Sequence, residues 1–316
     1  MTDPAPILDL IEAFRRSKTM FAATALGIFD GDRPKGAATD RLLDACVALG
    51  LLEKRGQEYV NTPVADDYLR SSSPRTLSGY VRYSNSVLYP LWANLEDAAI
   101  DGTHRWKQTF GEEHSALFAN FFKTEESKRD FLMGMHGFGM LSSPAVVAAF
   151  DLSRFRRLVD LGGATGHLAL AARERYPRMT AAVFDLAGVI EIAKEHAGDR
   201  VELIPGDFFQ DELPPADLYA LGRILHDWNE EKIRRLLARI HAALPAGGGL
   251  LIAERLLRED RGGPVATHMQ SLNMLVCTEG RERTLSEYTT LLREAGFQEV
   301  RGHVTGAPLD AILAVK

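Results

Sequence analysis

Several features are scarce in this chain, and each scarcity excludes a class of protein. Cysteine occurs only twice in 316 residues, as Cys46 and Cys277, which is too few for a disulfide framework or a zinc cluster. Lysine and arginine number 37 against 43 aspartate and glutamate residues, a net charge of -6, whereas proteins that bind a phosphate backbone usually carry a basic excess. No uninterrupted apolar run reaches the roughly 18 residues of a membrane span. The N-terminus also lacks the basic and apolar regions of a signal peptide. We therefore expect a soluble, cytoplasmic protein with neither a nucleic-acid nor a membrane partner.

The composition is otherwise ordinary, with 46% hydrophobic and 25% charged residues, and the length allows two compact units. Residues 6–150 carry apolar side chains at three- and four-residue spacing, which predicts helices. Residues 156–316 alternate short β-branched runs with helical patterns, which predicts an α/β domain with a mostly parallel sheet. We therefore predict an all-helical domain at 1–150 and an α/β domain at 151–316.

The helical part is too apolar for the surface of a monomer, so we predict a homodimer formed through it, burying on the order of 2,000 Å² or more. The apolar residues concerned are Ile7, Leu8, Leu10, Ile11, Phe14, Met20, Phe21, Leu26, Ile28 and Phe29.

Residues 38–62 predict a helix ending near Gly50, followed by a small ribbon that turns at Gly56. A helix followed by a ribbon is the second half of a winged helix. DNA recognition is one interpretation, and a scaffold for dimerisation is the other. The helix carries Asp40 and Asp44 on the same mixed face as Arg41, which does not suit a phosphate backbone. We therefore favour the scaffold over a winged-helix regulator.

The strongest local motif is the sequence LVDLGGATG at residues 158–166. It predicts a buried strand that runs into a glycine-rich turn, where Gly162 and Gly166 allow a ligand to approach the backbone closely. The motif is not G-x-G-x-x-G, because Ala164 occupies the place of the second glycine. Asp185 ends the next strand, where its carboxylate can accept both hydroxyls of a ribose. The two features together indicate a nucleoside ligand.

A third element, GDFF at residues 206–209, follows the third predicted strand. An acid beside an aromatic ring at a strand end can bond an adenine amino group and stack on its ring. The alternative is a turn with core aromatics, and Phe209 can be core alone. The order of the three elements favours adenosine without a pyrophosphate over NAD, which leaves a dehydrogenase as the rival enzyme.

His226 lies in RILHDW, at the end of the fourth predicted strand, where open α/β sheets place reactive groups. A single histidine is more often structural than catalytic, but a pKa of roughly 6.5 suits a general base. Glu254 and Glu282 are the candidates to orient its ring. The alternative for both is a solvated loop acid, and Glu282 can instead pair with Arg281 or Arg283. No convincing metal-ligand cluster is visible.

These motifs give the chain a specific resemblance. VDLGGATG, FDL, GDFF, LGRILHDW, LLIAERLL and GRERTLSEY occur in the order found in S-adenosylmethionine-dependent small-molecule O-methyltransferases. FDLSRF, YPRM, RILHDW, MQSLNMLV and LDAILA resemble the acetylserotonin O-methyltransferase-like group in particular, and the helical part matches too, through RLLDACVALGLLEK and FLMGMHG. The resemblance implies a Rossmann-like class I methyltransferase domain preceded by an all-helical dimerisation domain with a shortened winged-helix element.

The resemblance also implies roles for individual residues, with S-adenosyl-L-methionine as the cofactor. His226 resembles the general base, and Glu254 and Glu282 resemble the pair beside it. The residues matching cofactor contacts are Asp160, Gly162, Gly163, Gly166, Asp185, Leu186, Gly206, Asp207, Phe208 and Arg223. Those matching the substrate pocket are Met133, His136, Asp227, Met269 and Asn273, with Met135 and Phe138 nearby; Met133 can equally be helix core. No metal is implied.

One segment departs from the family pattern. Relatives carry a longer stretch with a further helix between the positions of Phe29 and Thr39, where this chain has only DGDRPKGAA. The difference affects the expected dimer surface and one wall of the substrate pocket, but not the cofactor site.

The function implied is transfer of a methyl group from S-adenosylmethionine to a hydroxyl of a small aromatic acceptor. A catalytically silent, cofactor-binding interaction protein is the alternative from another class. The presence of His226 with both glutamates argues against it.

Overall fold

The computed structural model groups the chain into two compact units. Unit 1 comprises Met1–Pro90 and Thr124–Gly137, and unit 2 comprises Leu91–Lys123 and Phe138–Lys316. This division differs from the single boundary that we drew near residue 150, because part of the predicted helical domain belongs to the unit that contains the sheet. The residues described are 2–32, 34, 36, 38–111 and 117–316.

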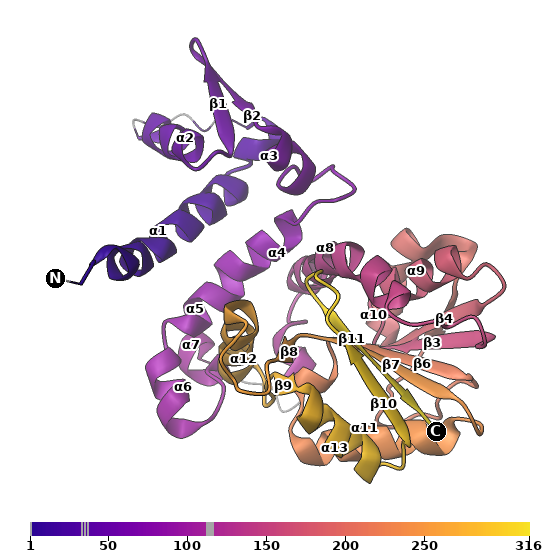
Figure 1. The fold of residues 1–316 in the computed structure, drawn as a ribbon. Coiled ribbons are helices and arrows are strands. Elements are labelled where there is room, and N and C mark those ends of the chain that lie inside the picture. The colour runs from indigo at the N-terminus through magenta and orange to yellow at the C-terminus, as the bar shows by residue number, and fades with distance from the viewer. Residues whose placement is uncertain (1, 33, 35, 37, 112–116) are drawn as a thin grey trace. The chain divides into compact units, whose positions relative to one another are not determined.

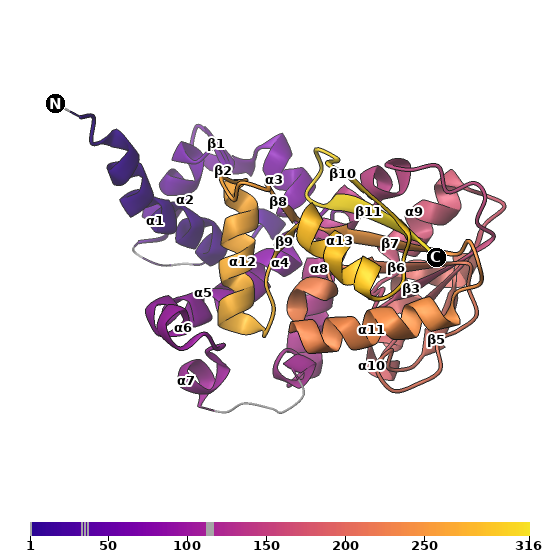
Figure 2. The same cartoon turned by 60° about the horizontal axis from the view of Figure 1, so that its bottom comes forward.

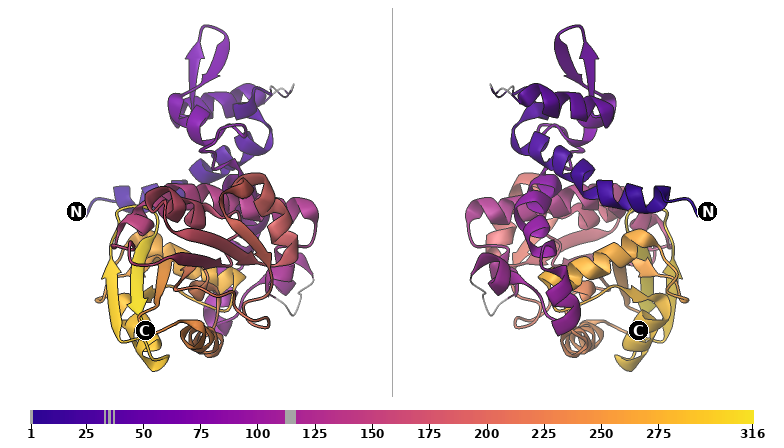
Figure 3. Two further views of the ribbon diagram at one scale, coloured as in Figure 1. Left: turned by 90° about the vertical axis from the view of Figure 1, so that its right-hand side faces the viewer. Right: turned by 90° about the vertical axis from the view of Figure 1, so that its left-hand side faces the viewer.

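In its described residues unit 1 is helical apart from one antiparallel ribbon, as the sequence predicts. The predicted helix before Gly50 and the ribbon turning at Gly56 are both present, and Figure 3 shows the ribbon beside its helix α2. The predicted shortening after Phe29 falls partly on residues 33, 35 and 37, which lie outside the described residues. The elements are α1 (Ala5–Ala25), α2 (Thr39–Ala48), β1 (Leu52–Arg55), β2 (Glu58–Asn61), α3 (Pro63–Tyr68), α4 (Ser78–Tyr83), a π-helical turn (Ser84–Leu88) and the first half of α8 (Glu125–Ala148).

Unit 2 contains a seven-stranded sheet in the order β10-β11-β7-β6-β3-β4-β5 (Figure 1). All pairs are parallel except those of β11, which runs antiparallel to both neighbours. The predicted α/β architecture is therefore confirmed. The strands are β3 (Arg157–Leu161), β4 (Thr180–Asp185), β5 (Glu202–Pro205), β6 (Leu218–Gly222), β7 (Gly249–Glu254), β10 (Glu299–His303) and β11 (Asp310–Val315).

Alternate residues of the strands point to opposite faces, and each face has its own core. Leu158 of β3 belongs to the core under α9 and α10, whereas its neighbour Val159 belongs to the core under α11 and α13. Figure 2 shows the latter two helices lying across the strands. The result is a three-layer sandwich whose helices are α9 (His167–Arg175), α10 (Ala187–Ala197), α11 (Glu230–Ala243) and α13 (Leu285–Glu294).

A small group of helices in unit 2 packs against α12 (Val265–Cys277). Trp106 is buried, and its indole N–H donates to the carbonyl of Cys277 at 2.8 Å. The sequence analysis did not predict the two-stranded parallel sheet beside α12, formed by β8 (Leu256–Leu257) and β9 (Arg283–Thr284). The remaining elements are α5 (Tyr89–Trp92), α6 (Leu95–Asp101), α7 (Trp106–Phe110) and single 3-10 turns at Ile28–Asp30, Leu117–Asn120, Gly198–Arg200 and Leu225–Asp227.

Helix α8 is long and apolar enough to cross a membrane, judged by length and composition only. Its best window has a mean hydropathy of 1.3, and 44% of that window is buried within the protein. Core helices of soluble proteins have the same properties. This helix is not visible in the sequence as an uninterrupted apolar run, because glycines and serines interrupt the run. They do not lower its mean hydropathy below the value typical of a membrane-spanning helix.

The carboxyl ends of β3, β4, β6 and β7 lie side by side along one edge of the sheet. The strand order reverses beside β3, which is where open α/β sheets bind their ligands. The glycine turn, Asp185, His226 and Glu254 all follow these strand ends. The topology thus brings the predicted residues to one edge.

Helix α13 begins with a reciprocal cap that generates a stability prediction. The Thr284 hydroxyl accepts the Glu287 backbone N–H at 3.2 Å, and the Glu287 carboxylate accepts the Thr284 N–H at 2.8 Å. We expect Thr284→Ala to lower the free energy of unfolding by about 1 kcal/mol, because the backbone N–H of Glu287 loses its acceptor. Urea denaturation checks this. Thr284→Ser should be close to the parent, and Thr290→Ala, an exposed change in the same helix, should cost less than about 0.5 kcal/mol. Equal losses at both threonines would contradict the cap.

Candidate active site

The turn after β3 places glycine residues, which carry no side chain, at the edge of the sheet. Gly162 adopts a φ of 69° and Gly166 a φ of 82°, in the left-handed region that favours glycine. A Cβ on Gly162 would lie 2.6 Å from Ile224 Cδ1, and a Cβ on Gly163 would lie 2.7 Å from the Asp160 carboxyl group. Ala164 is also left-handed, with a φ of 49°. The turn therefore needs glycine at residues 162 and 163 because side chains of the protein pack against it, and the predicted approach of a ligand stays a prediction.

Two acidic side chains flank this turn. Asp160 is buried in β3, and its Oδ2 has no hydrogen-bond partner among the described residues. Burial and the charge of Asp185 raise the pKa of Asp160 to about 7. Asp185 accepts the backbone N–H of Ala164 at 2.9 Å and of Leu186 at 2.7 Å. Burial raises its pKa to about 6 against these two donors. Asp185 thus stands at the end of β4 beside the glycine turn, where the sequence predicts a ribose ligand.

The third predicted element follows β5. The Asp207 carboxylate accepts the Phe209 N–H at 2.8 Å and the Gln210 amide at 2.7 Å. The ring of Phe208 lies close to Gly162, at 3.2 Å from the position of an added Cβ. Phe209 packs on Trp228 with ring centroids 5.1 Å apart. Phe208 therefore borders the glycine turn, whereas Phe209 packs against the core, as one of the two interpretations allowed.

His226 is buried in the 3-10 turn after β6, and Glu254 at the end of β7 fixes that turn. One carboxylate oxygen of Glu254 accepts three backbone N–H groups, from Ile224 at 3.0 Å, Leu225 at 2.9 Å and His226 at 3.4 Å. The other oxygen lies 3.3 Å from His226 Nδ1. Glu254 is fully buried, so it is not a solvated loop acid.

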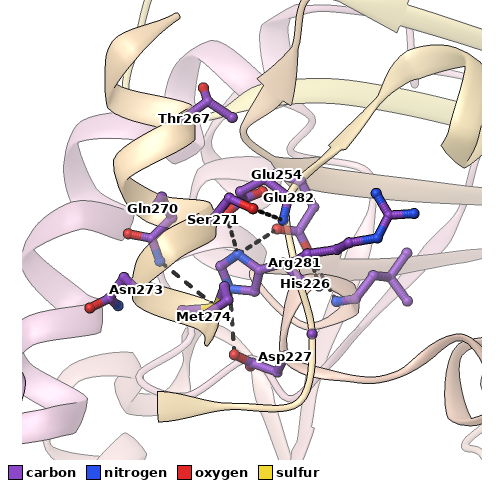
Figure 4. A network of polar contacts seen from close by, with 12 residues as sticks. His226, Asp227, Glu254, Thr267, Gln270, Ser271, Asn273, Met274, Arg281 and Glu282 are labelled. Carbon is purple, nitrogen blue, oxygen red and sulfur yellow. Dashed lines mark hydrogen bonds and ion pairs between the residues drawn. The ribbon is translucent and has the colours of Figure 1, made fainter. Parts of the chain in front are cut away.

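Glu282 approaches the same ring nitrogen as Glu254 (Figure 4). Its Oε1 lies 2.6 Å from His226 Nδ1, the length of a strong, charge-assisted hydrogen bond. The pairing of β8 with β9 places Arg283 opposite Leu256, which brings residue 282 beside the end of β7. Arg281 is not its partner, because that side chain pairs with Glu230 and Glu287.

The carboxylates around His226 lie in an environment that disfavours charge. Burial raises the pKa of Glu254 to about 6 and that of Glu282 to about 8. The charge of His226 opposes the shift at Glu254, and Arg223, Arg255 and Arg283 oppose it at Glu282. When Glu282 is charged and accepts the hydrogen bond, the proton of this contact lies on Nδ1, and Nε2 keeps its lone pair.

The same three side chains offer one ligand atom each within 4.8 Å of one another, a grouping that can hold a metal ion. The sequence analysis saw no such cluster, because the residues are separated by 28 positions each. The 2.6 Å contact between His226 Nδ1 and Glu282 Oε1 indicates a shared proton. A cation bound here would have to replace that proton. The geometry is that of a hydrogen-bonded triad.

Arg223 and Asp227 lie on either side of His226 in sequence. Arg223 has a left-handed φ of 57°, and its guanidinium lies 5.6 Å from the ring centroid of Phe138. Asp227 Oδ1 is 3.7 Å from His226 Nε2, beyond hydrogen-bond distance. Burial raises the pKa of Asp227 to about 7, with His226 opposing. Asp227 therefore lies near Nε2 without forming a hydrogen bond to it.

The predicted substrate residues divide between the units. Met269 is exposed on α12, and the buried Asn273 accepts the indole N–H of Trp92 at 2.9 Å. Met133 and His136 lie on the first half of α8, in unit 1. Within that unit Met133 packs against Gly79, where an added Cβ would be 2.8 Å away. The substrate roles of these residues stay predictions.

The sequence analysis missed two neighbours of the triad. Gly280 lies against the backbone of His226 and Asp227, and Arg283 is buried beside it. Trp92 was missed as well. The glycine and arginine both lie in the GRERT segment that supplied Glu282, so the segment was recognised but their contacts were not visible in it.

Comparison with known proteins gives a consistent result. The family model described as "O-methyltransferase domain" matches residues 92–298. Acetylserotonin O-methyltransferase of Bos taurus is 41% identical over 96% of this chain and 95% of its own length. The enzyme of that name from Gallus gallus is 40% identical over 99% and 97%.

Solved structures agree with the sequences. The crystal structure of human N-acetylserotonin methyltransferase in complex with SAM has a TM-score of 0.94 and 39% identity, covering 100% of this chain and 98% of that one. PigF with SAH has a TM-score of 0.89 and 29% identity, with both chains covered fully. The fold of unit 2 is the class I methyltransferase fold that the motifs implied. This chain belongs to the O-methyltransferase family and is an S-adenosylmethionine-dependent O-methyltransferase of small molecules.

Proposed function

We propose that this enzyme transfers the methyl group to a hydroxyl of a small aromatic acceptor, with His226 as the general base. The observation that carries the proposal is the buried imidazole whose Nδ1 is held at 2.6 Å from Glu282. This arrangement leaves Nε2 as the proton acceptor. The relatives named acetylserotonin O-methyltransferases favour an acceptor like N-acetylserotonin, an indole with a ring hydroxyl.

The residues at the sheet edge fit the cofactor. Gly162 and Gly163 place backbone at this edge without a side chain, because a Cβ at either position would collide with Ile224 or Asp160, and Asp160 Oδ2 has no hydrogen-bond partner among the described residues. Asp185 would hold the ribose hydroxyls, and Asp207 with Phe208 would border the adenine. Gly166, Leu186, Gly206 and Arg223 would complete the surroundings. When bound, S-adenosylmethionine supplies an activated methyl group on a sulfonium.

The chain's own contribution is alignment and removal of a proton. A phenol has a pKa near 10, so at neutral pH its oxygen is protonated and a weak nucleophile. His226 Nε2 accepts that proton, which contributes about 10²- to 10⁴-fold to the rate. Glu282 stabilises the imidazolium that forms, and Glu254 holds the turn so that the ring keeps its position. Met269 and Asn273 of unit 2 are the proposed acceptor contacts.

We also propose that the enzyme is a homodimer through unit 1. Five apolar residues of α1, at positions 7, 8, 10, 11 and 14, lie on one face of the helix. The exposed fraction of each is between 52% and 69% in the single chain. Apolar faces of this kind mark interaction surfaces. The residues are Ile7, Leu8, Leu10, Ile11 and Phe14.

His226→Asn tests the base. The amide can still donate to Glu282 but cannot take up a proton, so with N-acetylserotonin as the probe we expect kcat to fall by about 10²- to 10⁴-fold. Affinity for S-adenosylhomocysteine, measured by calorimetry, should be unchanged. The exposed His303 on β10 gives the matched control His303→Asn, which should keep the parent rate. An unchanged rate in the first variant would remove His226 from this role.

The cofactor site gives a pH-dependent prediction. A charged Asp185 accepts ribose hydroxyls more strongly than a neutral one, and its pKa is raised to about 6. Affinity for S-adenosylhomocysteine should therefore be lost as the pH falls below about 6, and should hold above it. Asp185→Asn should bind weakly at every pH without this step. Asp160→Asn tests whether the neighbouring Asp160 causes the change instead. This variant should still lose affinity for S-adenosylhomocysteine as the pH falls. A pH-independent affinity in the parent would refute the ribose role.

The dimer is tested by sedimentation equilibrium at micromolar concentration. We expect twice the chain mass for the parent and a single chain mass for Leu10→Glu combined with Phe14→Glu, because charge on the apolar face prevents its burial. Arg15→Ala, on the same helix, should remain dimeric. A monomeric parent would refute the proposal.

A further inference from the structure

The loop at residues 279–283 is attached to the backbone of the turn that carries His226. The Glu279 N–H donates to the Asp227 carbonyl at 3.4 Å. At Gly280 the two backbones are so close that an added Cβ would lie 2.1 Å from the His226 carbonyl oxygen. The distance between the imidazole and Glu282 is therefore set by backbone contacts as well as by the hydrogen bond itself.

Arg283 ties the same two segments together from within the protein. Its side chain is almost fully buried, and Nη1 donates to the carbonyl of Arg281 at 3.0 Å and to that of Leu225 at 3.5 Å. These two residues immediately precede Glu282 and His226. Nη1 of Arg283 thus links the backbone next to His226 with the backbone next to Glu282, the two residues that form the 2.6 Å contact.

The burial of the charged Arg283 side chain is energetically unfavourable. Within the described part of the chain no carboxylate forms an ion pair with it within 4.0 Å, and its Nε has no hydrogen-bond partner. A buried cation without a carboxylate partner is unfavourable unless nearby charges compensate. The compensating charge lies slightly farther away, because the guanidinium acts electrostatically on Glu282.

We propose that Arg283 is a positioning residue for the base, which holds the turn of His226 and the loop of Glu282 at a fixed separation and favours the charged form of Glu282. The proposal rests on the proposed role of His226. It separates into a geometric part, the bridge between two carbonyls, and an electrostatic part, the positive charge.

The electrostatic part has a defined sign. Removing the Arg283 charge raises the pKa of Glu282 further, so its carboxyl group is neutral up to a higher pH and no longer accepts the Nδ1 proton as an anion. The acid limb of the pH–rate profile should therefore move to higher pH. The other titratable or charged groups that act on Glu282, or on which it acts, are Arg223, His226, Asp227, Glu254, Arg255, Tyr288 and Asp310.

Arg283→Met and Arg283→Lys separate the two parts, with Arg281→Met as the matched control, because that arginine is in the same segment but pairs outward with Glu230 and Glu287. With N-acetylserotonin we expect Arg283→Met to lower kcat by about tenfold to a hundredfold with little change in KM, since misplacement of a catalytic group has effects of this size. Its acid limb should move to higher pH. Arg283→Lys should keep the acid limb near that of the parent while losing part of kcat.

A second readout does not require turnover. The proton held between Nδ1 and Glu282 should give a far-downfield NMR resonance in the parent, absent in His226→Asn. Arg283→Met should lose or weaken it, and Arg281→Met should keep it. If Arg283→Met binds no S-adenosylhomocysteine and is unfolded, Arg283→Lys is judged by the same readings. A resonance and pH profile unchanged in a folded variant would overturn the proposal. If the parent methylates no N-acetylserotonin but the resonance responds as stated, the positioning role stands and the proposed acceptor fails.

Discussion

The short contact between His226 Nδ1 and the Glu282 carboxylate is the interaction on which the rest of this site depends. Two glutamates and an imidazole share a space without solvent, where a bare carboxylate would be neutral. The arrangement is stable only if a proton lies between them and nearby cations balance the remaining charge. That proton fixes the tautomer of the ring, and the tautomer decides which nitrogen is available to a substrate.

The fold supplies this contact through ordinary elements. The parallel order of β6 and β7 brings the turn of His226 next to Glu254, whose carboxylate caps the three N–H groups of that turn. The short pairing of β8 with β9 returns the chain so that Glu282 meets the ring. The glycine turn and Asp185 occupy the neighbouring strand ends of the same edge. The proposed sites of donor binding and of proton removal are therefore adjacent because adjacent parallel strands end together.

The sequence predicted those parts of the structure that have a local signal. The strands that precede the glycine turn, Asp185, GDFF and His226, and the turn itself, follow from apolar runs and from glycines that need a positive φ. Strand β10 was missed because it is an edge strand with alternating exposed residues and few apolar side chains. The partner of Glu282 was left open between His226 and two arginines, because only the β8–β9 pairing decides it. The bridge made by Arg283 joins backbone carbonyls, which leave no trace in the sequence.

Measurement of the ¹⁵N chemical shifts of the His226 ring tests the central claim most directly. The parent protein is labelled on histidine, and the His226→Asn variant identifies the signals that belong to this ring. The account predicts that near neutral pH Nδ1 carries the proton and Nε2 is unprotonated. A ring protonated on Nε2 alone, with Nδ1 bare beside the two glutamates, would contradict the assignment of His226 as the base.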